Sequence, residues 1–177
     1  MKYMTPELLA RYQSEDADTA LQAYEQWEQA GERYRAELSV VRRQLPESAV
    51  ELMDRFRLHD ARVLWAGIGD GALAIVLLLD GEEGGLQIEY DLAAPAAVTP
   101  HPEIAEDCPV EWLYDEWGLT DGDGGGSFVH SILFTDGAEL RLVFRNLRWR
   151  HFPRSMFVGV PNPPSLAANK LAELVAA

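Results

Sequence analysis

The sequence predicts an α+β fold in which a helical N-terminal part precedes an antiparallel sheet. Apolar residues in the first 57 positions recur every three or four residues, as in helices, whereas from residue 58 they alternate with polar residues, as in strands. Turns and one long connection at residues 93–109, rather than helices, join the strand-like runs, which favours an antiparallel meander. We expect a single domain over residues 1–177: a helical hairpin with one long helix (1–57), five or six strands (58–152), and an extended segment with a C-terminal helix (153–177).

The long helix of the predicted hairpin carries one continuous apolar seam. Its members are spaced alternately four and three residues apart: Ala20, Tyr24, Trp27, Gly31, Tyr34, Leu38, Val41 and Leu45. A strict repeat of about 3.5 residues places them on one face of a helix. The seam consists mostly of aromatic and small residues rather than leucine and isoleucine, which favours packing within the chain over a coiled coil. Both states stay open, a monomer or a homodimer through the long helix.

The sheet is predicted to centre on a hairpin between residues 128 and 144. Apolar residues and His130 occupy every second position of residues 128–134, and a second alternating run covers residues 140–144. Asp136 and Gly137 lie between the two runs, and Asp-Gly suits a type I′ turn, whose two central residues both need positive φ. We therefore expect Asp136 and Gly137 at the centre of the turn. Earlier strands are expected at residues 58–65, 72–79, 86–92 and 110–117.

Composition and charge exclude several classes of partner. The formal net charge of −14 disfavours nucleic acid and anionic membranes. No apolar run approaches the roughly 20 residues that span a bilayer, and the opening residues lack the apolar core of a signal peptide. Cys108 is the single cysteine, so no disulfide can form within the chain. These features predict a cytoplasmic protein.

The charges are unevenly distributed along the chain. Residues 58–140 hold 17 of the 29 acidic residues and a single base, Arg62, whereas residues 141–177 hold six bases and one acid. One interpretation is that arginines of the last strand compensate acidic residues on neighbouring strands. The other is that an acidic face is left for a basic partner.

Five acidic residues on two predicted strands are candidates for such a face. They are Glu89, Asp91, Glu111, Asp115 and Glu116. In the strand at 110–117 we expect Trp112 and Tyr114 to point inward, and Glu111 and Asp115 to share a face. This arrangement predicts a non-catalytic protein-interaction module that docks a basic protein partner and needs no cofactor.

The alternative is an enzyme whose site includes histidine. His59 and Asp60 are adjacent, so in a regular strand they point to opposite faces, and His59 then caps a helix or binds a backbone carbonyl. If His59 instead lies near His130, with Glu89 or Asp91 beside them, the group could bind a divalent metal or perform acid–base chemistry. Whether the two imidazoles converge decides between the structural and the functional interpretation.

Two stretches of the chain resemble an uncharacterised bacterial family, a domain of unknown function. One is the opening Met-Lys-Tyr-Met-Thr-Pro-Glu-Leu-Leu of residues 1–9, and the other is Leu-His-Asp-Ala at 58–61 followed by residues 128–149. The resemblance implies a helical N-terminal part, a sheet that starts at Leu-His-Asp-Ala, and a closing hairpin that ends in an aromatic residue. It implies no activity.

Overall fold

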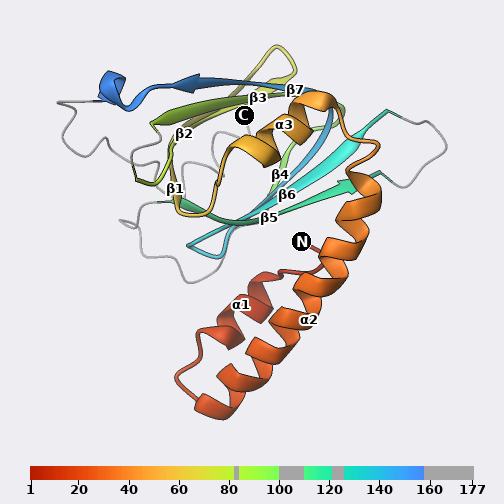
Figure 1. Cartoon of the computed structure of the whole chain (residues 1–177), viewed down its shortest axis with the longest axis vertical. Coiled ribbons are helices and arrows are strands. Elements are labelled where there is room, and N and C mark those ends of the chain that lie inside the picture. The colour runs from red at the N-terminus through yellow and green to blue at the C-terminus, as the bar shows by residue number, and fades with distance from the viewer. Residues whose placement is uncertain (82–83, 100–109, 121–125, 158–177) are drawn as a thin grey trace.

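The computed structural model describes residues 1–81, 84–99, 110–120 and 126–157 (Figure 1). Within these residues the helices are α1 (Pro6–Tyr12), α2 (Ala17–Val41) and α3 (Glu47–Arg55), with one short 3-10 helix, η1 (Arg154–Phe157). The strands are β1 (Ala61–Gly69), β2 (Ala72–Leu78), β3 (Gly85–Leu92), β4 (Ala97–Thr99), β5 (Glu111–Leu119), β6 (Phe128–Phe134) and β7 (Glu139–Phe152). The predicted C-terminal helix falls in residues 158–177, outside the described part.

Local sequence signals set the starts of the first two helices. The Thr5 hydroxyl accepts a hydrogen bond from Leu8 N–H, and Pro6 occupies the first turn of α1, where its missing N–H costs nothing. The Asp16 carboxylate caps α2 by accepting from Thr19 N–H. α2 ends at Val41, four residues before the predicted end at Leu45. None of the described helices is long and apolar enough to cross a membrane.

The seam predicted along α2 is only partly buried. Its last members, Val41 and Leu45, belong to the core, but Tyr24 is 49% exposed. The other fully buried residues of the helix are Ala23 and Ala30, which are small enough to let another element approach closely. α2 packs against α1 and β5 of its own chain (Figure 1). Pairing with a second copy stays a prediction.

The strands close into a barrel, which corrects the predicted open meander. β1, β2 and β3 form one antiparallel meander and β5, β6 and β7 another, and the pairings β1–β5 and β3–β7 join them into a six-stranded ring. The length of β7 makes closure possible, because residues 139–144 pair with β6 and residues 144–152 pair with β3. The short β4 pairs with the beginning of β7.

The turn between β6 and β7 differs from the predicted type I′ turn. Gly137 N–H donates to the carbonyl of Phe134 at 2.9 Å, which makes Thr135 and Asp136 the central residues of the turn. Gly137 follows them with φ of 79°, and Asp136 does not have positive φ. The prediction was therefore wrong by one residue. The hairpin uses a three-residue loop in which glycine alone adopts the left-handed conformation.

A bulge in β5 changes which side chains enter the barrel. The pairing of β5 with β6 shifts register between Trp112 and Tyr114, so Leu113 is an extra residue. Trp112 points inward as predicted, but Tyr114 turns outward and packs edge-on against Trp27 of α2, with ring centroids 4.8 Å apart. The residue after it, Asp115, therefore turns into the barrel instead of lying on the surface with Glu111.

The barrel is least continuous between β1 and β5. Two residue pairs join these strands, Ala61 with Trp112 and Arg62 with Glu111. Farther along β5, α2 takes the place of a neighbouring strand, since the backbone N–H of Trp117 donates to the Tyr34 hydroxyl at 2.9 Å. Beyond its two paired positions with β1, β5 is thus bordered by α2.

Candidate functional site

A chain of three polar side chains crosses the barrel interior. The Tyr90 hydroxyl lies 2.9 Å from Nδ1 of His130, and Nε2 of His130 lies 3.2 Å from Oδ2 of Asp115. Tyr90 and His130 are fully buried. Trp112 Nε1 donates to the other carboxylate oxygen of Asp115 at 3.1 Å. Strands β3, β5 and β6 contribute to this chain, so only the closed barrel assembles it.

Burial determines which atoms of Tyr90 and His130 carry protons. It raises the pKa of Tyr90 well above its ordinary value, so the phenol keeps its proton and donates to Nδ1 of His130. Nε2 of His130 then carries the ring proton and donates to Asp115. Burial also lowers the pKa of His130, outweighing the opposing effect of Asp115, and the imidazole is neutral.

Asp115 is ionised although it lies against the core. Burial alone would raise the pKa of this carboxyl, but the hydrogen bond from His130, the charge interaction with His130 and the hydrogen bond from Trp112 lower the pKa below its ordinary value. Trp117 also lies beside this pair, and its ring stacks on the ring of His130 with centroids 3.6 Å apart. Its indole N–H lies near enough to lower the pKa of Asp115 without making a hydrogen bond of normal geometry.

The Asp115 carboxylate opens to a surface cleft. Its side chain is 26% exposed, in contrast to the fully buried His130. The cleft has a volume of about 320 Å³ and lies between α2, α3 and β5. Its lining residues are Tyr34, Leu38, Arg42, Leu52, Met53, Phe56, Leu58, Asp115 and Trp117. Arg42 forms an ion pair with Asp54 at 2.5 Å. We call this feature the Asp115 cleft.

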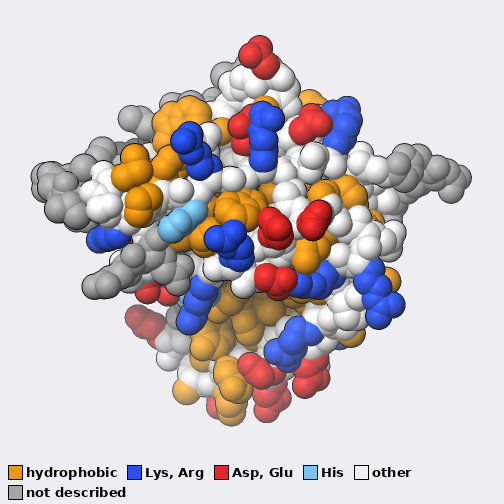
Figure 2. All heavy atoms as spheres, turned by 45° about the horizontal axis from the view of Figure 1, so that its top comes forward, with side chains coloured by type: hydrophobic (Ala, Val, Ile, Leu, Met, Phe, Trp, Pro, Cys, Tyr) orange, Lys and Arg blue, Asp and Glu red, His pale blue; other side chains and the backbone are white. Residues whose placement is uncertain are grey.

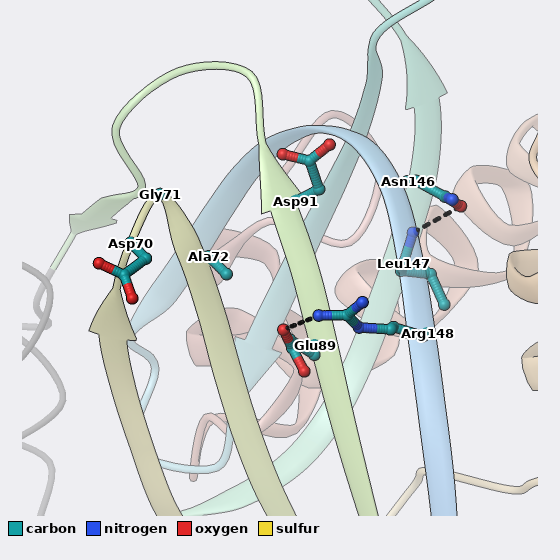
Figure 3. A pocket seen from close by; sticks show the side chains of 8 residues that line it. All are labelled: Asp70, Gly71, Ala72, Glu89, Asp91, Asn146, Leu147 and Arg148. Atoms are coloured by element: carbon teal, nitrogen blue, oxygen red, sulfur yellow. Dashed lines mark hydrogen bonds and ion pairs between the residues drawn. The ribbon is translucent and has the colours of Figure 1, made fainter.

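The predicted acidic face does not form as one surface. Glu89 and Asp91 lie on β3, which two strands separate from β5, and β5 carries the other three residues. Glu89 pairs with Arg148 at 2.5 Å, as Figure 3 shows, and Asp91 lies 3.4 Å from Arg145. Glu111 lies 4.0 Å from Arg62.

The partners of these acids confirm compensation between neighbouring strands. Arg148 and Glu89 occupy directly paired positions of β7 and β3. On the face drawn in Figure 2, Lys and Arg side chains are interspersed with Asp and Glu side chains. Two acids of β3, Glu89 and Asp91, are therefore balanced by arginines of β7.

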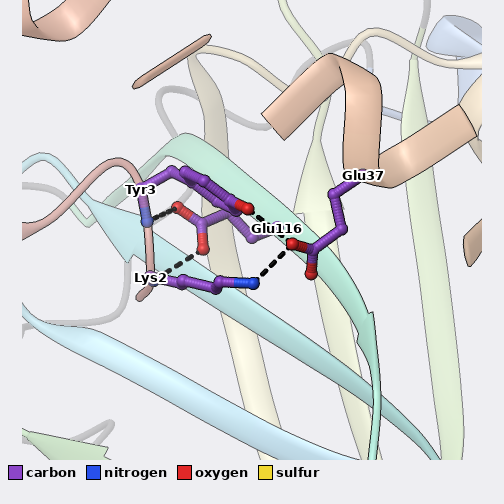
Figure 4. A network of polar contacts seen from close by, with 4 residues as sticks. All are labelled: Lys2, Tyr3, Glu37 and Glu116. Carbon is purple, nitrogen blue, oxygen red and sulfur yellow. Dashed lines mark hydrogen bonds and ion pairs between the residues drawn. The ribbon is translucent and has the colours of Figure 1, made fainter. Parts of the chain in front are cut away.

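Glu116 has a structural role that the sequence did not indicate. Glu116 is 6% exposed, and its carboxylate accepts the backbone N–H groups of Lys2, Tyr3 and Met4 at 2.6–2.8 Å. Figure 4 shows the contacts with Lys2 and Tyr3. Glu37 of α2 holds the same segment, since it binds Lys2 Nζ and accepts from the Tyr3 hydroxyl. Glu116 thus fastens residues 2–4 over β5 and is not part of an acidic docking face.

His59 and His130 do not converge. β1 starts at Ala61 rather than at the predicted Leu58, and His59 and Asp60 lie in a preceding turn, where Asp60 has φ of 66°. The His59 ring packs edge-on against the outward-facing Tyr114, while His130 lies inside the barrel. Nδ1 of His59 is 2.8 Å from the Asp60 carboxylate but not aligned for a hydrogen bond.

The described residues contain no group of three or more His, Cys, Asp and Glu side chains that could hold a metal ion. The metal-dependent alternative therefore has no site in this part of the chain. What the structure does bring together is His130, Asp115 and Tyr90. Two of these were candidates from the sequence, and Tyr90 was expected merely as part of an alternating strand.

Comparison with known proteins adds no functional assignment. No protein-family model matches the chain, and no curated protein matches its sequence significantly. The resemblance to an uncharacterised bacterial family stays a prediction.

Proposed function

We propose that this protein is a non-catalytic interaction module that captures a basic side chain of a partner protein in the Asp115 cleft. The observation that carries the proposal is an ionised, mostly buried carboxylate with neutral hydrogen-bond donors, His130 and Trp112. The one cationic side chain in the lining, Arg42, is paired with Asp54. Within the described residues the cleft thus offers Asp115 no counter-ion.

An uncompensated carboxylate in such surroundings favours a cationic ligand. Taking a charge out of water costs several kcal/mol in proteins, and an opposite charge offsets that cost when hydrogen-bond geometry is good. The net charge of −14 raises the local concentration of cations around the whole molecule. We therefore propose the same class of partner that the sequence predicted, a basic protein, but with one carboxylate, Asp115, as the docking point in place of a broad acidic face.

An acid–base enzyme is the second candidate, because a phenol–imidazole–carboxylate chain ends at the cleft. The protonation states count against it. A general acid or base works best with a pKa near the operating pH, whereas the pKa of Asp115 and the pKa of His130 are both lowered. Asp115 is held as a fixed anion, which suits binding better than proton transfer.

Nuclear magnetic resonance on the full-length chain tests the proposal. We expect the peptide acetyl-Gly-Gly-Lys-Gly-Gly-amide to shift the indole N–H signals of Trp112 and Trp117 in a saturable way. Asp115→Asn removes the charge with little change in shape and is expected to abolish these shifts. Asp91→Asn is the matched control, since it makes the same charge change at a side chain that is 59% exposed on β3.

Equal shifts in Asp115→Asn and the parent chain contradict the proposal, as does the absence of shifts in the parent with both this peptide and its ε-methylated forms. A second measurement does not depend on the variant folding. Nuclear Overhauser contacts between the lysine ε-methylene of the peptide and the methyl groups of Leu38 and Met53 place the bound side chain in the cleft. Contacts elsewhere on the surface contradict the proposal.

A further inference from the structure

We infer that the basic group taken by the Asp115 cleft is an alkylated ammonium, namely the methylated side chain of a partner's lysine rather than an unmodified lysine or an arginine. This inference rests on the proposed function and narrows its ligand. It follows from the balance between hydrogen-bond acceptors and apolar surface in the lining of the cleft.

Acceptors are scarce in the cleft. Oδ1 of Asp115 already accepts from Trp112 at 3.1 Å and Oδ2 from His130 at 3.2 Å. The Tyr34 hydroxyl oxygen accepts from the backbone N–H of Trp117. A primary ammonium brings three N–H donors and a guanidinium five. Asp115 can accept about two more hydrogen bonds, so an ammonium would leave about one N–H and a guanidinium about three without a partner in the lining. Each such N–H that loses its water costs about 1–3 kcal/mol.

The remaining lining is apolar or aromatic. Leucine and methionine side chains come from α2, from α3 and from the residue that precedes the turn at His59 and Asp60: Leu38, Leu52, Met53 and Leu58. Tyr34, Phe56 and Trp117 add three aromatic rings. Aromatic faces attract cations that are weakly hydrated, and quaternary ammonium groups are the ligands best suited to this attraction.

A methylated ammonium matches both properties of the cleft. Its charge is attracted by the Asp115 carboxylate, its methyl groups contact apolar and aromatic surface, and a trimethylated nitrogen has no N–H to satisfy. The volume of about 320 Å³ lies at the lower end of the range for ligand pockets, which suits one side-chain headgroup rather than a large molecule.

Three probes differing only at the side-chain terminus test the inference on the full-length chain. They are lysine with an acetylated α-amino group and a methylamide at its carboxyl end, the ε-trimethylated form of the same molecule, and a neutral analogue with a quaternary carbon in place of the charged nitrogen. We expect the trimethylated probe to bind about tenfold more tightly than the unmethylated one. The neutral analogue should bind weakly, and Asp115→Asn should lose the preference for the charged probe.

The outcomes separate this inference from the proposed function. If the unmethylated probe binds as tightly as the trimethylated one or more tightly, the inference is wrong and the proposed function stands. Equal binding of the neutral and trimethylated probes overturns both, because the charge then plays no part. Absence of binding by all three probes also overturns both.

The aromatic contribution has its own test. Phe56→Leu keeps an apolar side chain and removes one ring from the lining. We expect it to weaken binding of the trimethylated probe about fivefold and binding of the unmethylated probe less. An unchanged affinity for the trimethylated probe contradicts the role of the aromatic lining. The comparison of the three probes on the parent chain does not require this variant to fold.

Discussion

Nε2 of His130 lies 3.2 Å from Oδ2 of Asp115, inside a barrel whose neighbouring strands β5 and β6 present these two residues. They are brought together by the bulge at Leu113, which turns Asp115 inward. The contact orders the interior and holds an ionised carboxylate at the edge of the Asp115 cleft. Its consequences for stability and binding can be measured separately.

Removing the imidazole should destabilise the fold strongly. His130→Leu leaves the Tyr90 hydroxyl and one oxygen of Asp115 without their partner in the core, and we expect a loss of about 3–4 kcal/mol in the free energy of unfolding. Tyr90→Phe removes one hydrogen bond at the far end and should cost about 1 kcal/mol. Urea denaturation measures both, and equal losses for the two variants would contradict the central position of His130.

The same pair predicts how stability changes with pH. The pKa of His130 is lowered in the folded protein from its ordinary value of 6.5, so the unfolded chain binds more protons around that pH. Stability is therefore present above pH 6.5 and is lost as the pH falls below it. Asp115, whose pKa is lowered from 3.8, adds a further loss in strong acid. Both groups therefore make the fold less stable as the pH falls.

Denaturation at a series of pH values checks this dependence. Replacing His130 by glutamine should flatten the slope between roughly pH 7.5 and pH 5, since the titrating group is gone. His59→Gln is the matched control, because that ring lies outside the barrel against Tyr114. An unchanged slope in His130→Gln would show that other groups cause the pH dependence.

The segment at residues 2–4 should depend on Glu116. Glu116→Ala removes the acceptor of three backbone N–H groups, and we expect a loss of about 2 kcal/mol. Hydrogen exchange at Lys2, Tyr3 and Met4 should become much faster than in the parent chain. Glu51→Ala, at an exposed position of α3, is the control. Unchanged exchange at these three amides would mean that the carboxylate does not hold the segment.

The hairpin turn offers a test of backbone conformation. Gly137 has φ of 79°, so Gly137→Val forces a β-branched residue into the left-handed region and should cost more than about 1 kcal/mol. Gly69→Ala is the control, because its φ is not positive and an added Cβ meets no atom within 4 Å. Thermal denaturation compares them, and an unchanged melting temperature for Gly137→Val refutes the turn assignment.

Local patterns predicted much of the fold. Alternation along residues 128–134 placed His130, Ile132 and Phe134 on one face, and all three are fully buried. The change of spacing at residue 58 separated helices from strands, and Thr5 with Pro6 marked the start of α1. These features depend on neighbouring residues, so a single sequence contains them.

Closure of the barrel and assembly of the site depend on contacts that a single sequence does not contain. The pairing of β3 with β7 joins residues about sixty positions apart, and nothing in the alternation of either strand indicates it. The bulge at Leu113 reverses the orientation of every following residue in β5. An uninterrupted strand therefore predicted Tyr114 inward and Asp115 on the surface, and the site was missed for that reason.

The pKa of Asp115, measured from the carbon-13 shift of its carboxyl group in the full-length chain, tests the central claim most directly. A carboxylate held as an anion by His130 and Trp112 should titrate below its ordinary value of 3.8, and the trimethylated lysine probe should lower the midpoint further. A midpoint near neutral pH would contradict this account, because Asp115 would then exchange a proton under working conditions and the acid–base enzyme would become the better interpretation.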